Sequence, residues 1–391
     1  MKTVNQKTLV KTLCILLITL TFASEAHAYP PDNAAVLYYK AFMILQEPNE
    51  DVKKMLTDLR DGKIKPNDEI RQCLQDNRYA IEFVETAAGV RDCDWGYDIS
   101  KGFDVMLPEL SKIRMTAFLL TAKAQTLAEE GDYKAALGKC LTIHRMARHL
   151  GDRMLISYLV GNSLTGLANK RIGEILSQVP DDIETLTRLK NQIYDITSRA
   201  NSLKAAMSSE REIAIQQIRK ENISTVLDSI GETDGISKDS IDKIRNGDEE
   251  FFKASREYYS YYVTSVQLAL DLPYPQSHQQ LKQLSEKAEK QAADNPAAIL
   301  SAALWPAATR ICTLDVKANT HFNALKAAID IYIVKAKTGR LPDTLPDGLP
   351  RDLFSGKDFE YEKTKNGFLL RCRGKDLDKD EIFKYEFKVS K

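Results

Sequence analysis

Apolar residues recur at the spacing of an α-helix along most of the chain after Asp32. The first such stretch reads PPDNAAVLYYKAFMIL, in which prolines and an Asp/Asn cap precede the apolar positions. The second reads PNDEIRQCLQDNRYAIEFVETAAG, with acids in its first turn and Gly89 as its stop signal. This pattern predicts a mainly α protein.

The clearest pair of predicted helices lies between Leu107 and Asp152. The two helices meet at Gly131, which can take the left-handed conformation that ends a helix, and Asp132, which can cap the next helix. The pair resembles a tetratricopeptide helical hairpin at Ala122, Ala124, Gly131, Tyr133 and Ala136. Because only one copy of this pattern is clear, we expect an irregular α-hairpin stack rather than a regular repeat array.

After Gly339 the apolar period changes from helical to alternating. The segments FEYE and GFLLRCR predict a hairpin joined at Lys365-Asn366-Gly367, and IFKYEFKV predicts a third strand. We therefore predict an α-helical body over residues 29–317. It is followed over 318–391 by a long helix and a small antiparallel β-sheet whose apolar face lies on that helix.

The N-terminus has the features of a secretory signal peptide over residues 1–28. Three lysines come before the apolar run Thr12–Ala23, and Ala26-His27-Ala28 supplies small residues at a cleavage site. An apolar run this short cannot cross the ~30 Å hydrocarbon core of a bilayer as a helix. We expect export to the periplasm or the extracellular space, with an uncleaved N-terminal anchor as the alternative.

Charge gives no reason to expect a nucleic acid or an anionic membrane as partner. The chain has 55 basic and 55 acidic residues, and removing three Lys and Glu25 with the signal leaves 52 and 54. No second apolar run approaches membrane-spanning length, so we expect no membrane span after signal cleavage. We expect the partner to be a protein or a peptide.

Of the six cysteines, five remain after signal cleavage. Exported chains meet an oxidising compartment in which suitably placed thiols pair. Cys73 and Cys93 flank one predicted helix end and form the tentative disulfide. The alternative is that all five are small, buried apolar residues.

The C-terminal region resembles the corresponding part of type II secretion major pseudopilins. The similarity is carried by the helix exit 338–342, the turn 349–356, the strand residues 359–361 and the hairpin residues 366–368. It covers only about the last fifth of the chain, and the methylated N-terminal pilin helix is missing, so it does not imply fibre assembly. DNAAVLYYKAF, CDWGYD and LPELSKIR are similar to features of a group of secreted bacterial helical proteins without a known activity.

Acidic residues follow Gly374 in the loop before the third predicted strand, namely Asp376, Asp378, Asp380 and Glu381. Calcium takes six to eight oxygen ligands, which such a loop can supply in part. The pseudopilin resemblance implies calcium in this loop, since Gly374 and Asp376 match its G-x-D start. The alternative is a solvated acidic loop, which the neighbouring Lys375 and Lys379 favour.

Two other places can hold a ligand. Asp92, Asp94 and Asp98 surround Trp95 and can form a sugar-binding or metal-binding corner, or a linker in which Trp95 plugs a helix junction. Tyr258 and Tyr262 belong to a tyrosine cluster that can line a ligand groove or simply pack helices.

No nucleophile elbow, phosphate loop or zinc-protease helix appears in the sequence. Two hypotheses remain. The first is an exported helical scaffold that binds a peptide or protein and lacks a catalytic centre. The second is an envelope hydrolase or carbohydrate-active protein that uses the Asp92–Asp98 region.

Overall fold

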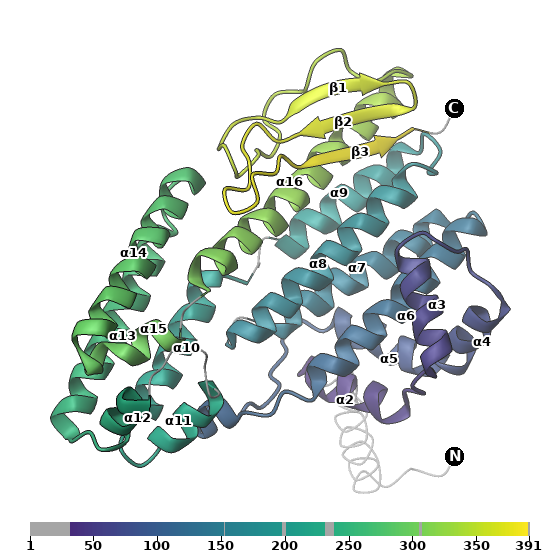
Figure 1. Ribbon diagram of the computed structural model, residues 1–391. Coiled ribbons are helices and arrows are strands. Elements are labelled where there is room, and N and C mark those ends of the chain that lie inside the picture. The colour runs from purple at the N-terminus through teal and green to yellow at the C-terminus, as the bar shows by residue number, and fades with distance from the viewer. Residues whose placement is uncertain (1–31, 152, 198–200, 231–237, 305–306, 390–391) are drawn as a thin grey trace, which may run out of the picture.

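The computed structural model describes residues 32–389 except 152, 198–200, 231–237 and 305–306. The predicted signal peptide, residues 1–28, lies outside the described residues. The fold is mainly α, as predicted (Figure 1). Its α-helices are α2 (Ala34–Ile44), α3 (Glu50–Arg60), α4 (Asp68–Asp76), α5 (Arg78–Gly89), α6 (Glu109–Glu129), α7 (Tyr133–Leu150), α8 (Leu155–Leu176), α9 (Ile183–Thr197), α10 (Leu203–Gln217), α11 (Ile223–Ile230), α12 (Lys238–Arg245), α13 (Glu249–Ala269), α14 (Tyr274–Asp294), α15 (Ile299–Leu304) and α16 (Ala308–Thr338). Short 3₁₀ helices are η1 (Ile99–Asp104) and η2 (Pro296–Ala298).

The α6–α7 hairpin is confirmed at the predicted junction. Gly131 has a φ of 82°, a conformation that favours glycine. Asp132 caps α7, because its side chain accepts a hydrogen bond from the Ala135 N–H at 3.0 Å. Helix α8 then packs against α7, so α6, α7 and α8 form a stack of antiparallel helices.

The stretch predicted to run as one helix up to Gly89 is instead two helices, α4 and α5, which meet at Asn77. Asn77 is buried, and its side chain pairs with the backbone of Gln46. The side-chain oxygen accepts from the Gln46 N–H at 2.9 Å, and the amide donates to the Gln46 carbonyl at 3.0 Å. This distant partner fixes the helix junction.

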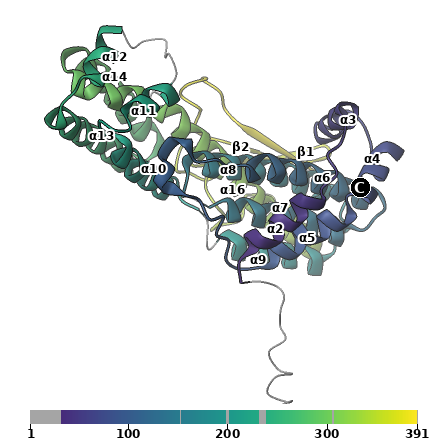
Figure 2. The same cartoon turned by 90° about the horizontal axis from the view of Figure 1, so that it is seen from below.

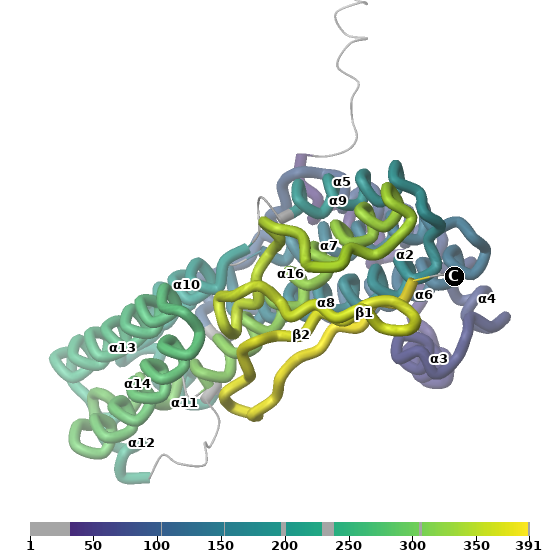
Figure 3. The backbone as a smooth tube through the Cα atoms, turned by 90° about the horizontal axis from the view of Figure 1, so that it is seen from above, coloured from purple at the N-terminus to yellow at the C-terminus, as the bar shows by residue number. Residues whose placement is uncertain are grey.

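The C-terminal helix and sheet are also confirmed. Helix α16 ends at Gly339, which has a φ of 74°. Strands β1 (Glu360–Thr364), β2 (Gly367–Arg371) and β3 (Lys384–Lys388) form an antiparallel sheet in the order β1-β2-β3. The sheet lies over α16 (Figures 1 and 3), and the rings of Tyr332 and Phe368 meet there with centroids 5.5 Å apart.

One hydrophobic core joins helices α6 to α9 with α16 and the sheet. The expected boundary between residues 317 and 318 lies inside α16, which is one continuous helix. The sheet on one side of this boundary shares its hydrophobic core with helices α6 to α9 on the other side. A second core lies among α2 to α8, and a third lies among the helices from α8 to α16. Figure 2 shows α11 to α14 at one end of the elongated molecule and α3 and α4 at the other.

Candidate functional site

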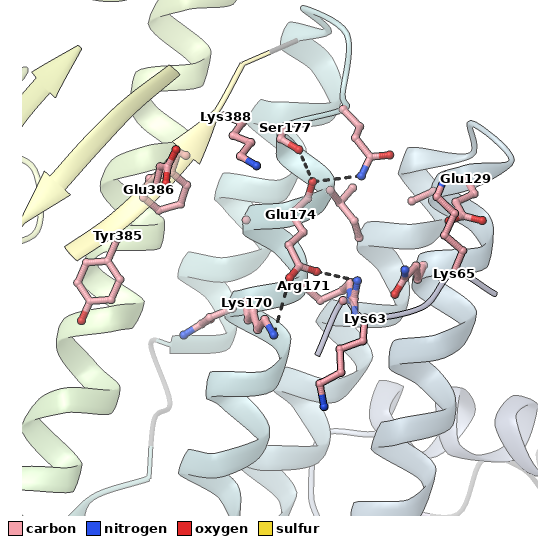
Figure 4. Close-up of a pocket in the computed structure, with 18 of the residues that line it drawn as sticks. Lys63, Lys65, Glu129, Lys170, Arg171, Glu174, Ser177, Tyr385, Glu386 and Lys388 are labelled. Atoms are coloured by element: carbon pink, nitrogen blue, oxygen red, sulfur yellow. Dashed lines mark hydrogen bonds and ion pairs between the residues drawn. The ribbon is translucent and has the colours of Figure 1, made fainter. Parts of the chain in front are cut away.

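An open groove of about 910 Å³ lies between α8 and β3. The loop after α3, at Gly62–Lys65, and the C-terminal end of α6 complete its wall. Figure 4 shows α8 in the middle of the lining residues, with β3 on one side and Lys63, Lys65 and Glu129 on the other. We call it the α8–β3 groove.

The lining of the α8–β3 groove is basic on balance. Three acidic residues line it, Glu129, Glu174 and Glu386, against six basic residues. The basic residues are Lys63, Lys65, Lys170, Arg171, Lys384 and Lys388. The excess of positive charge favours an anionic ligand.

The basic residues of α8 are held in place by Glu174. The Arg171 guanidinium, 6% exposed, lies 2.6 Å from the Glu174 carboxylate. The Lys170 ammonium lies 4.0 Å from the same carboxylate and donates to the Arg60 carbonyl at 3.1 Å. One wall of the groove is therefore fixed by the ion pairs drawn in Figure 4 and by the contact of Lys170 with α3.

β3 is an edge strand, and two hydrogen bonds identify the side of it that faces β2. At one end the Cys372 N–H donates to the Phe383 carbonyl at 3.0 Å, and at the other the Val389 N–H donates to the Asn366 carbonyl at 2.8 Å. In an antiparallel ladder, alternate residues of a strand exchange hydrogen bonds with the same neighbour. The odd-numbered residues of β3 therefore pair with β2.

The even-numbered residues of β3 turn their backbone groups to the outer edge, along the groove. The Lys388 carbonyl accepts a hydrogen bond from the Tyr332 hydroxyl. Within the described residues, no other segment bonds to the outward N–H and C=O groups of Lys384 and Glu386. Such an edge can accept a further strand.

His321 of α16 packs against the Tyr385 side chain of β3. Its ring stacks on Tyr385 with centroids 5.1 Å apart and planes 4° from parallel. Burial lowers the pKa of His321 to about 4, so the imidazole is neutral at pH 7.

The Asp92–Asp98 region borders a second cavity, of about 330 Å³. Trp95, 7% exposed, lines it but is mostly packed away. Its ring stacks on Tyr38 with centroids 5.3 Å apart, and its Nε1–H donates to the His149 carbonyl at 2.7 Å. These contacts match the alternative of a plug at a helix junction.

The carboxylates beside Trp95 make local turn contacts. Asp94 accepts from the Gly96 N–H at 3.0 Å and lies 3.6 Å from Arg153. Asp98 accepts from the Ser100 hydroxyl at 2.5 Å, and it does not line the cavity. The two carboxylates therefore do not converge there.

Tyr258 and Tyr262 belong to α13 and contact the segments that follow it. The Tyr262 side chain is 5% exposed and meets the Ser285 hydroxyl at 3.4 Å. The Tyr258 hydroxyl accepts from the Asn295 amide at 3.0 Å. The void beside them holds only about 10 Å³, so these rings fill a helix interface.

The structure does not assemble the predicted calcium ligands. Asp376 is buried and caps its own turn, accepting from the Asp378 N–H at 2.9 Å. Asp378 pairs with His278 at 2.8 Å, Asp380 pairs with Lys375, and the Glu381 carbonyl accepts from the Asp376 N–H at 2.8 Å. No three His, Cys, Asp or Glu side chains gather as a metal site anywhere in the described ranges.

The predicted disulfide is not formed either, and both Cys73 and Cys93 are free thiols. Cys73 lies 3.9 Å from the Asn77 amide, where α5 begins, whereas Cys93 follows the end of α5. The ends of a twelve-residue helix are about 18 Å apart, whereas bonded cysteines need Cβ atoms about 4 Å apart.

Comparison with known protein families, with curated proteins and with solved structures finds no match to this chain.

Among the residues that the structure describes, one segment, Pro296–Thr338, is apolar enough by length and composition alone to cross a membrane. It runs over residues 305–306, which the structure does not describe. Half of its apolar window is buried inside the protein. Core helices pass the same test, so the expected absence of a membrane span stays a prediction.

Sequence reasoning missed the α8–β3 groove. The Lys384, Glu386 and Lys388 alternation was a usable signal, because it places three charged side chains on one face of a predicted strand. Lys170 and Arg171 gave no comparable signal, since adjacent basic residues on a helix are common surface features.

Proposed function

We propose that this protein is an exported helical scaffold that binds a polypeptide partner through the α8–β3 groove and lacks a catalytic role. Export rests on the signal-like residues 1–28. The observation that carries the binding role is the open outer edge of β3, which lies beside a basic groove. We place the hydrolase hypothesis second because Asp94 and Asp98 use their oxygens in turns.

In this proposal the partner contributes an extended, acidic segment. Its backbone pairs with the outward N–H and C=O groups of Lys384 and Glu386, which supplies affinity without regard to sequence. Its carboxylates lie near Lys65, Lys170 and Lys388, which supply the preference for negative charge.

Glu386→Pro tests the strand pairing, because proline removes the outward N–H and leaves the bonds to β2 in place. The matched control is Lys363→Pro, at an outward position on β1, the opposite edge of the sheet. The probe is a fluorescent peptide of about ten residues that alternates Glu with Val, long enough for one strand.

We expect Glu386→Pro to weaken binding of this peptide at least tenfold in fluorescence anisotropy, while Lys363→Pro binds like the wild type. Binding should also weaken between ~50 and ~300 mM salt, because ions screen the lysines. A version that alternates Lys with Val should not bind. Equal losses in both proline variants, or equal binding of both peptides, would remove the support for the proposal.

A further inference from the structure

A separate cavity of about 530 Å³ lies between α10, α14 and the first half of α16. It adjoins a smaller cavity of about 200 Å³, with which it shares Tyr158, Asn201 and Asn319. The larger volume alone is within the range of small-molecule sites. We call this space the α10–α14–α16 cavity, and it is distinct from the α8–β3 groove.

Asp315 presents a carboxylate in this cavity. Its Oδ1 accepts from three donors: the Tyr158 hydroxyl, the Asn162 amide at 3.3 Å and the Asn319 amide at 3.1 Å. Among the described residues, no donor reaches Oδ2. The carboxylate is thus fixed in orientation by one oxygen, and the other remains available to a ligand.

The charge of Asp315 has no cationic partner within ion-pair distance in the described part of the chain. Lys204 and His278 also line the cavity, and both have partners: Lys204 lies 2.6 Å from Asp271, and His278 lies 2.8 Å from Asp378. Burial raises the pKa of the Asp315 carboxyl, since a desolvated carboxylate is costly without a counter-charge. A bound cation would relieve this cost.

The remaining walls are mostly apolar. Leu203 of α10, Leu281 of α14 and Val316 of α16 line the cavity, as do Leu270, Leu272 and Leu353. An apolar wall next to one oriented carboxylate is the arrangement that binds a molecule with a charged end and a hydrocarbon body.

We propose that the α10–α14–α16 cavity binds a small apolar amine. The ammonium group pairs with Oδ2 of Asp315, and the hydrocarbon chain lies on Leu203, Leu281 and Val316. This site operates independently of the polypeptide partner, so its test does not depend on the α8–β3 groove.

The test is isothermal titration calorimetry with n-hexylammonium chloride, with sodium hexanoate and hexanol as probes of the same length but different charge. We expect hexylammonium to bind the wild type at least tenfold more tightly than either of the others. Asp315→Asn, which keeps the shape and removes the charge, should lower hexylammonium affinity at least tenfold. The matched control is Asp330→Asn on the same helix, at a carboxylate that pairs with Lys190 outside the cavity.

A second variant keeps the test decisive if Asp315→Asn does not fold. Thr309→Trp, at a half-buried lining position, fills the cavity and leaves Asp315 unchanged, so it should also abolish binding. Unchanged hexylammonium affinity in both variants overturns the proposal. So does wild-type protein that binds hexylammonium no better than hexanol.

Discussion

Replacing Asp352 with alanine is expected to lower the free energy of unfolding by about 4 kcal/mol. Asp352 is fully buried in the loop between α16 and β1. Its Oδ1 accepts from the Phe354 N–H at 2.9 Å, and its Oδ2 accepts from the Ser355 hydroxyl and from the N–H groups of Arg373 and Gly374, at 2.7, 2.9 and 3.0 Å. Alanine would leave these four donors without their acceptor, at roughly 1 kcal/mol or more each.

Urea unfolding measures this loss, with Asp358→Ala as the control. The Asp358 side chain is 69% exposed, and its carboxylate forms an exposed ion pair with the Arg351 guanidinium at 3.5 Å. Its removal should therefore change the free energy of unfolding by less than ~1 kcal/mol. Similar losses in the two variants would show that the Asp352 contacts do not hold this loop to Arg373 and Gly374, which follow β2.

Acid is expected to destabilise the fold as pH falls from 6.5 toward 4. Burial lowers the pKa of His144 to about 3 and those of His149 and His321 to about 4. Unfolded histidine titrates near pH 6.5, so in this window the unfolded chain binds more protons than the folded one. The stability from these neutral rings is fully present above pH 6.5 and is lost as pH approaches 4.

A pKa lowered from 6.5 to about 4 corresponds to roughly 3 kcal/mol per histidine as an upper bound. His321→Phe should keep the stack on Tyr385 and flatten the dependence of stability on pH, measured by urea unfolding at pH 7, 6 and 5. Identical slopes in the wild type and His321→Phe would contradict the assignment of His321 as a buried neutral ring.

Local signals in the sequence predicted the helix ends and the sheet. Gly131, Gly339 and the Asn366-Gly367 turn act through backbone conformation, which depends on the residue itself and few neighbours. The break at Asn77 could not be predicted in this way, because the contact that fixes it comes from Gln46. No residue near Asn77 in the sequence encodes that partner.

The candidate sites were harder to predict, for the same reason. Trp95 and Tyr262 are of residue types that are common in ligand-binding sites, but tertiary packing buries both side chains. The α8–β3 groove is lined by Lys63, Lys170 and Lys384, which are far apart in the sequence. They lie around one groove because of the tertiary packing of β3 against α8. Asp315 was likewise inconspicuous, because its role depends on Tyr158 and Asn162 from another helix.

The most direct test of a peptide-binding scaffold is residue-resolved hydrogen exchange of the backbone amides of β3, with and without the acidic peptide. We expect the peptide to slow exchange at Lys384 and Glu386, whose N–H groups face the groove, and to leave Tyr385, already bonded to β2, unchanged. Peptide binding that leaves the exchange of Lys384 and Glu386 unaltered would contradict the account.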